Sequence, residues 1–255
     1  ALLACEGLDT HADVFLNGSK IFHSQNMFVN HEASVKHLLR EGENNLYIRF
    51  YSPVQHLMPN RTTNGFEYPA GNDARDEKMS VYYRKAPYHY GWDWGMRLVQ
   101  MGIWRPVHLT LYNHARIDDL FVKQETVSKE VAKVTNFIEI QSVDNNPTPA
   151  KLTVSYALPG EERKTEERTI TLTKGVNKIA VPLKIHNPQL WMPNGWGEPH
   201  LYDFTAQLLI NDDVVAEKSH QIGLRNIRVV AEDDEHGRSF YFEVNGKPMF
   251  AKGAN

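Results

Sequence analysis

The sequence predicts an all-β protein of two domains. Apolar and polar side chains alternate over short segments, for example from Leu46 to Tyr51, and a period of two residues is typical of strands with one buried face. Turn-forming pairs such as Asn17-Gly18 separate these segments. No long amphipathic helical pattern occurs, and 255 residues suffice for two ordinary domains.

The first domain, residues 1–113, is expected to contain several short strands. Asn17-Gly18 predicts a hairpin because both residues tolerate a positive φ. Val35–Leu39 fits either a short helical turn or a strand. Pro106 indicates an edge position or a bulge, since proline cannot donate a ladder hydrogen bond. The predicted strands are Leu2–Glu6, Asp13–Leu16, Leu46–Tyr51 and Ile103–Tyr112.

The strand pattern stops between Ser52 and Ser80. This segment contains three prolines, two glycines and a charged run from Asp73 to Lys78. A loop of this length inside a compact domain is usually functional or disordered. The loop leads directly into an aromatic stretch. It therefore either forms an ordered wall beside Asp93 or extends into solvent, and the sequence does not decide between the two.

The second domain, residues 114–226, is expected to be an immunoglobulin-like sandwich. Seven short strands over about 110 residues, with turn signals between them, are typical of that fold. The Cys…Trp…Cys framework of antibody domains is absent. A corner rich in tryptophan and proline, Trp191–Pro199, is interpreted first as packing and second as a ligand site. The predicted strands are Ile117–Gln124, Val131–Val143, Lys151–Leu158, Glu167–Leu172, Lys178–Leu183, Leu201–Ile210 and Val214–Ile222.

Residues 227–255 form a third segment. Ser239–Val244 and Lys247–Ala251, joined by Asn245-Gly246, predict another hairpin. The sequence pattern alone predicts no sheet for this hairpin to join.

The candidate functional stretch is Arg84-Lys-Ala-Pro-Tyr-His-Tyr-Gly-Trp-Asp-Trp-Gly95. Its glycines and proline interrupt the alternation of aromatic residues and predict a shaped loop. Aromatic rings can stack on the C–H faces of a sugar, and the Asp93 carboxylate can accept hydrogen bonds from hydroxyls. The alternative is an aromatic corner that closes a sandwich, with Asp93 capping a turn. Residue types alone leave both interpretations open.

Several motifs along the chain resemble the β-mannosidases of glycoside hydrolase family 2, and they occur in the order in which that family has them. They are Cys5–Gly18, Trp92-Asp-Trp-Gly95, Gly102-Ile-Trp-Arg105, Leu190–Gly195, Ile222-Gly-Leu-Arg225 and Val244–Asn255.

The resemblance implies an organisation and a set of site residues. Residues 1–113 would be a galactose-binding-like jelly-roll sandwich lacking its first strands, and 227–255 would begin a (β/α)₈ catalytic barrel that is otherwise missing. Trp92 and Asp93 would contact the terminal mannosyl unit, with Tyr90 and Trp94 in supporting positions. The partners implied are a β-mannoside and the barrel of the same parent chain.

The resemblance also implies a retaining mechanism whose two catalytic glutamates lie on barrel strands beyond Asn255. No catalytic residue is therefore expected within this chain, and the chain alone is expected to be inactive. The acids present do not replace that pair, because adjacent acids such as Asp118-Asp119 diverge on a strand. No cofactor or metal is expected, since neither a phosphate loop nor Cys/His ligand spacing occurs.

Composition excludes other classes of partner. A net charge of −3 with both signs interspersed argues against a nucleic-acid or anionic-membrane partner. No apolar run approaches the roughly 20 residues of a membrane span. The single cysteine, Cys5, cannot form an intrachain disulfide. By resemblance, the compartment would be periplasmic or extracellular in bacteria and lysosomal in eukaryotes.

Three functional readings compete. The first is part of a β-mannosidase-like hydrolase, the second a stand-alone carbohydrate-binding module, and the third a β-sandwich scaffold for adhesion. A barrel-opening segment favours the first, because a self-contained module has no use for it. Other family 2 specificities, β-galactosidase or β-glucuronidase, share the architecture, whereas Trp92-Asp-Trp-Gly95 preceded by Tyr88-His-Tyr-Gly91 favours mannose.

Overall fold

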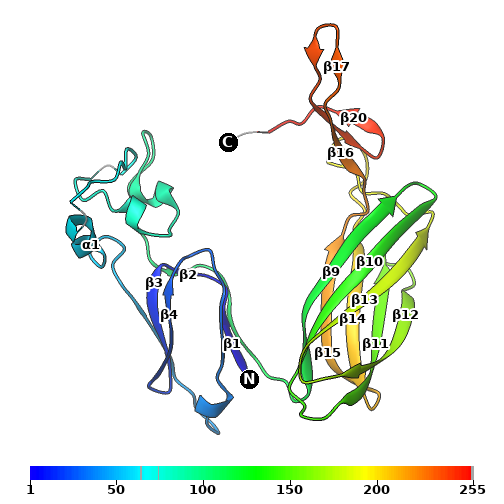
Figure 1. Ribbon diagram of the computed structural model, residues 1–255, viewed down its shortest axis with the longest axis horizontal. Coiled ribbons are helices and arrows are strands. Elements are labelled where there is room, and N and C mark those ends of the chain that lie inside the picture. The colour runs from blue at the N-terminus through cyan, green and yellow to red at the C-terminus, as the bar shows by residue number, and fades with distance from the viewer. Residues whose placement is uncertain (64, 74, 254–255) are drawn as a thin grey trace. The chain divides into compact units, whose positions relative to one another are not determined.

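The computed structural model describes residues 1–63, 65–73 and 75–253. Its contacts divide the chain into a first unit, Ala1–Leu111, and a second unit, Tyr112–Asn255. The regular structure of both is mainly antiparallel strands (Figure 1). Residues 64 and 74 of the predicted loop, and the last two residues of the predicted barrel segment, lie outside the described residues. The domain boundaries at 113 and 226 stay predictions.

The first unit contains two three-stranded sheets and a short strand pair. Strands β1 (Leu2–Cys5) and β3 (His11–Leu16) are each paired on both sides. The hairpin at Asn17-Gly18 is confirmed, because β3 pairs with β4 and the two turn residues have φ values of 51° and 86°. The other strands are β5 (His31–Ser34) and β8 (Val107–Thr110) beside β1, β4 (Ser19–Gln25) and β6 (Leu46–Phe50) beside β3, and the pair β2 (Leu8–Asp9) with β7 (Gly102–Ile103).

Apolar side chains of these strands form the core of the first unit. Cys5 and Val14 are fully buried, and Ile48 and Phe50 of β6 pack against them. Burial raises the pKa of the Cys5 thiol to about 11, which keeps it protonated and unreactive. Cys5 is therefore a packing residue.

The structure decides one open alternative and corrects one predicted strand. Val35–Leu39 contains a short 3₁₀ helix, η1 (Lys36–Leu38), rather than a strand. The single strand expected at Ile103–Tyr112 is wrong, because it is broken between β7 and β8. There the Trp104 ring lies against Met27, with its Nε1–H donating to the Met27 carbonyl at 2.8 Å, and Pro106 has no N–H to continue a ladder.

The segment that follows β6 has a small core of its own. It contains helix α1 (Met58–Thr63) and two 3₁₀ helices, η2 (Ser80–Tyr82) and η3 (Pro87–Tyr90). Met79, Tyr83 and Tyr90 are buried together in it. Part of the predicted loop is packed, because Met79 is buried, whereas residues 65–69 are exposed. The predicted wall beside Asp93 stays a prediction.

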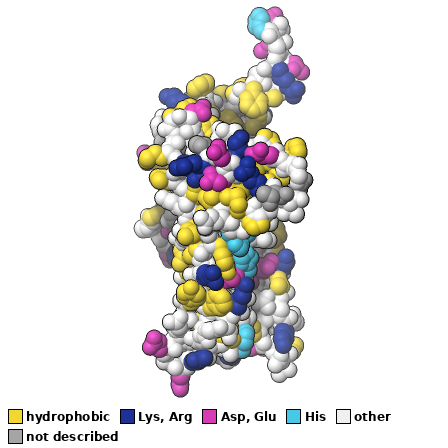
Figure 2. Space-filling model, turned by 90° about the vertical axis from the view of Figure 1, so that its left-hand side faces the viewer, with side chains coloured by type: hydrophobic (Ala, Val, Ile, Leu, Met, Phe, Trp, Pro, Cys, Tyr) yellow, Lys and Arg dark blue, Asp and Glu magenta, His cyan; other side chains and the backbone are white. Residues whose placement is uncertain are grey.

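Histidines cluster on the β3–β4 hairpin. His11 is 8% exposed, its Nδ1 lies 3.3 Å from Nε2 of His23, and its ring centroid lies 4.9 Å from that of His56. His23 in turn contacts Asp13 at 2.8 Å. Burial, followed by the nearby rings of His56 and His23, lowers the pKa of His11 to about 4. Histidine side chains gather on the face shown in Figure 2, where basic and acidic side chains also lie side by side.

The second unit contains the seven expected strands in two sheets. One sheet has the order β13-β10-β9 and the other β12-β11-β14-β15. Side chains alternate strictly between buried and half-buried along β14, and the fully buried members include Phe204 and Leu208. The strands are β9 (Ala115–Val127), β10 (Val131–Ser142), β11 (Thr148–Ala157), β12 (Lys164–Leu172), β13 (Gly175–His186), β14 (Tyr202–Ile210) and β15 (Asp213–Ile222).

The residues after 226 form a small sheet in the order β16-β19-β20. The predicted hairpin is confirmed, with positive φ at both Asn245 and Gly246. Its additional partner, β16, was not predicted. The strands are β16 (Ile227–Val230), β19 (Tyr241–Val244) and β20 (Lys247–Met249), and a second hairpin is formed by β17 (Asp233–Asp234) and β18 (Gly237–Arg238).

The tryptophan corner of the second unit is packed against its own chain. The Trp191 N–H donates to the Leu224 carbonyl at 2.9 Å, and the Arg225 guanidinium lies 4.8 Å from the centroid of the Trp191 ring. A Cβ on Gly223 would approach the Trp191 ring to 2.7 Å. These contacts support the interpretation of this corner as packing.

We expect Gly223→Ala to lower the stability of the second unit by about 1–3 kcal/mol, because the added methyl group forces the Trp191 ring to move. Gly253→Ala is the matched control, since no described atom lies within 4 Å of its added Cβ. Thermal melting of both variants measures the difference. Equal melting temperatures would contradict this account.

We expect the first unit to lose stability as the pH falls from about 6.5 towards 4. Between these values the unfolded chain protonates His11 whereas the folded chain does not, so acid favours unfolding. The loss from this residue is about 3 kcal/mol at most. Urea denaturation from pH 7 to 4 should show a flatter pH dependence for His11→Gln than for the control His236→Gln, which alters a highly exposed histidine. Parallel curves would refute the assignment.

Candidate functional site

The candidate site is carried by the segment Arg84–Gly95, whose centre turns inward. Tyr90, at the end of η3, is fully buried, and its hydroxyl donates to the Pro53 carbonyl at 2.8 Å. The Arg97 guanidinium lies 5.8 Å from the Tyr90 ring centroid. Burial raises the pKa of Tyr90 far above its ordinary value, so the ring stays neutral. Of the predicted sugar-site residues, Tyr90 is therefore buried, and it anchors the loop.

The residues after Gly91 turn outward. Trp92 and Gly95 exchange backbone hydrogen bonds of 3.3 and 3.1 Å, which close a tight turn. Trp92 is 46% exposed and Trp94 is 85% exposed, with ring centroids 6.1 Å apart and an interplanar angle of 77°. Asp93, between them, is also exposed. Among the described residues no hydrogen bond or ion pair involves its carboxylate, so the turn-capping alternative finds no partner there.

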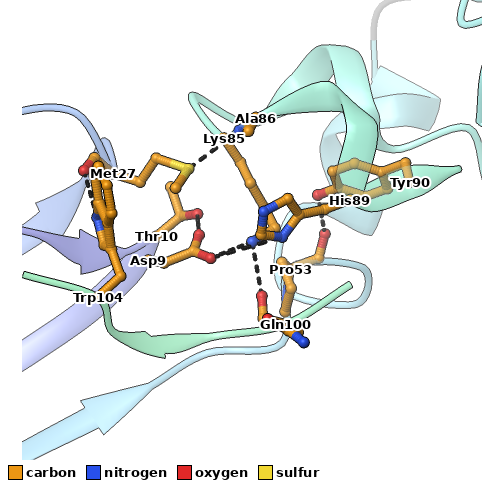
Figure 3. A network of polar contacts seen from close by, with 10 residues as sticks. All are labelled: Asp9, Thr10, Met27, Pro53, Lys85, Ala86, His89, Tyr90, Gln100 and Trp104. Carbon is orange, nitrogen blue, oxygen red and sulfur yellow. Dashed lines mark hydrogen bonds and ion pairs between the residues drawn. The ribbon is translucent and has the colours of Figure 1, made fainter. Parts of the chain in front are cut away.

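A buried polar network lies at the base of this segment (Figure 3). Lys85 forms an ion pair with Asp9 at the end of β2, and its Nζ donates to the Gln100 carbonyl at 2.7 Å. The Thr10 hydroxyl donates to the other Asp9 oxygen at 2.5 Å. His89 Nδ1 lies 4.0 Å from Asp9, and burial together with the Lys85 charge lowers the pKa of His89. The network joins the start and the end of the loop to the sandwich.

A second buried ion pair braces the same loop. The Asp73 side chain is fully buried and accepts hydrogen bonds from Arg97 Nε at 3.2 Å and from the Ser80 N–H at 3.1 Å. Both framework carboxylates, Asp9 and Asp73, are therefore held by cations. Neither is available to act as a general acid or nucleophile, whereas Asp93 is free to accept hydrogen bonds.

Trp92 and Asp93 do not line two sizeable cavities of the described chain. One of about 590 Å³ is in the second unit, between strands that carry Val134, Tyr156 and Leu183. Neither it nor the open groove of about 540 Å³ beside Arg84 in the first unit is lined by Trp92 or Asp93. The predicted sugar contacts thus sit on a projecting turn of this chain.

No group of three or more histidine, cysteine or acidic side chains among the described residues could hold a metal ion. No described helix is both long and apolar enough to cross a membrane.

Sequence reasoning missed the framework residues Asp9, Lys85, Asp73 and Arg97. The available signal was weak. Asp9 follows the apolar Leu8, and Lys85 precedes Ala86-Pro87 within an aromatic stretch, but charged residues in such places are usually solvated.

Comparison with known families accounts for most of the chain. Residues 1–105 match the profile described as glycosyl hydrolase 2 galactose-binding domain-like, and residues 115–225 match glycosyl hydrolases family 2. The chain belongs to glycoside hydrolase family 2. The predicted fold class, a galactose-binding-like sandwich followed by an immunoglobulin-like one, is confirmed.

Within family 2 the chain is similar to β-mannosidases. It is 37% identical over 254 residues to β-mannosidase B of Aspergillus clavatus and 34% identical over 263 residues to β-mannosidase B of Thermothelomyces thermophilus, covering 99% and 100% of this chain. The crystal structure of β-D-mannosidase from Dictyoglomus thermophilum is 34% identical, with a TM-score of 0.88 over 99% of the chain and 30% of that protein. The chain spans 29% of the length of both curated relatives.

A structure of more distant sequence has the same fold. A putative β-galactosidase from Bacteroides fragilis is 20% identical with a TM-score of 0.68, covering 97% of this chain and 32% of that one. At this identity the likeness concerns the fold alone.

Proposed function

We propose that this chain is part of a retaining exo-β-mannosidase and that its Trp92–Gly95 turn contributes to recognition of the terminal mannosyl unit. The proposal rests on the exposed Asp93 carboxylate, which has no partner among the described residues and lies between two exposed indoles on a buried framework. The similarity to β-mannosidases supports mannose as the sugar. The two catalytic carboxylic acids would come from outside residues 1–255.

The chemistry of the turn suits a sugar. Asp93 would accept hydrogen bonds from hydroxyl groups, and the Trp92 ring would cover an apolar C–H face of the pyranose. A hydrogen bond to a charged acceptor contributes about 1.5–3 kcal/mol once water is excluded. Exclusion of water requires a second surface facing the turn, which we assign to the catalytic part of the parent protein.

A second candidate is a stand-alone carbohydrate-binding module. The observation in its favour is the exposure of Trp94, which leaves an indole face free in the chain itself. This candidate predicts that the isolated chain binds manno-oligosaccharides, which isothermal titration calorimetry measures directly.

We expect the isolated chain to show no hydrolysis of aryl β-mannosides, because glycoside hydrolysis ordinarily needs a pair of carboxylic acids. Asp9 and Asp73 are held in ion pairs, and Asp93 is proposed to bind the sugar without a catalytic partner in this chain. The full-length parent, assayed in parallel, should release the aryl group. Turnover that persists through repurification and follows the isolated chain would contradict the proposal.

We expect Asp93→Ala in the full-length parent to lower kcat/KM for aryl β-mannosides about 10- to 150-fold, from the loss of about 1.5–3 kcal/mol of hydrogen bonding. The melting temperature should change little, because the side chain is exposed. Glu162→Ala, at an exposed acid of the second unit, is the control. An unchanged kcat/KM with a clear fall in melting temperature would instead assign Asp93 to turn capping.

A further inference from the structure

The side chain of Lys85 is completely buried, which is rare for a lysine. Its ammonium group contacts oxygens from two places far apart in the sequence, the Asp9 carboxylate and the Gln100 backbone carbonyl at 2.7 Å (Figure 3). Burial lowers the pKa of Lys85, and the Asp9 charge opposes that effect.

The two contacts bracket the candidate site. Lys85 lies seven residues before Trp92, and Gln100 lies five residues after Gly95. One ammonium group therefore joins the two stems of the loop to each other and to the end of β2. The neighbouring residue is fixed as well, because the Ala86 N–H donates to the Met27 sulfur at 3.1 Å.

Stability alone is a weak reason for this arrangement. An apolar pair of similar volume is often as stable as a buried ion pair, because burial removes both charges from water. The ion pair adds a defined geometry between the groups that it joins. An ammonium shared between a carboxylate and a carbonyl fixes the separation of the loop stems, whereas apolar packing tolerates sliding.

We infer that Lys85 and Asp9 are positioning residues, which fix the stems of the loop so that Trp92 and Asp93 are presented in one orientation. This inference rests on the proposed function of the turn. Neither residue touches the sugar. Their effect reaches the turn through the backbone between Lys85 and Gln100 and through Tyr90, which is anchored on Pro53.

The test separates position from stability in the full-length parent. Lys85→Met leaves the buried Asp9 carboxylate without the lysine cation, so stability and kcat/KM for an aryl β-mannoside should both fall. The double variant Asp9→Leu/Lys85→Met removes both charges and should recover most of the stability. Its kcat/KM should stay at least about 10-fold below that of the parent, because the stems are no longer fixed. The control removes the exposed cross-strand ion pair of the second unit in the same way, Glu139→Leu/Lys178→Met, and should leave kcat/KM unchanged.

Hydrogen exchange supplies a readout that needs no catalysis. In the double variant, the amides of residues 91–100 should exchange at least about 10-fold faster than in the parent, while those of β3 and β10 keep their rates. If the double variant does not fold, Asp9→Asn/Lys85→Met provides the same comparison, since it also removes both charges and keeps the shape of the Asp9 side chain. Parental exchange rates and parental kcat/KM in a stably folded variant would overturn the inference. A parent that does not cleave β-mannosides would refute the proposed function, whereas the exchange measurement would still decide whether the ion pair fixes the loop.

Discussion

The ion pair between Lys85 and Asp9 is the contact on which the arrangement of the candidate site depends. The two residues are 76 positions apart, so their contact forms only when the aromatic loop has returned to the end of β2. A buried ammonium without its carboxylate would be strongly unfavourable, which makes any other path of the loop costly. The loop is therefore ordered by the sandwich beneath it. Its local sequence, with Pro87, Gly91 and Gly95, specifies turns but contains no periodic pattern that could order it alone.

Most of the fold could be predicted because its signals are local. Along β14, buried and half-buried side chains alternate at every position, which a short window of sequence reveals. At Asn17-Gly18 the turn requires two residues that tolerate a positive φ, and both residue types do. The errors arise where a distant partner decides. The break between β7 and β8 depends on Trp104 donating to Met27, 77 residues away. Strand β16 was missed because it pairs with β19 across the intervening β17–β18 hairpin, and a short window of sequence contains no signal of such a pairing.

The candidate site divides in the same way. The exposure of Trp92 and Asp93 agrees with their place in a glycine-bounded turn, and the resemblance to family 2 had already singled them out. The burial of Tyr90 was not evident, since it belongs to the same aromatic series as Tyr88, which is exposed. Asp9 and Lys85 could not be found at all from sequence. Charged side chains are normally solvated, and only the folded chain reveals that each is the counter-ion of the other.

The geometry of the two indoles bears on which sugar-binding mode the turn can serve. Trp92 and Trp94 are inclined by 77°, so their faces cannot both lie along one extended glycan. A flat platform made by both rings would require them to be nearly coplanar. An inclined pair with a carboxylate between them instead offers one face and one acceptor to a single pyranose. Recognition of one terminal residue is what an exo-acting glycosidase requires. For the proposed function, the angle between the rings thus supports the exo-acting enzyme over an independent binding platform.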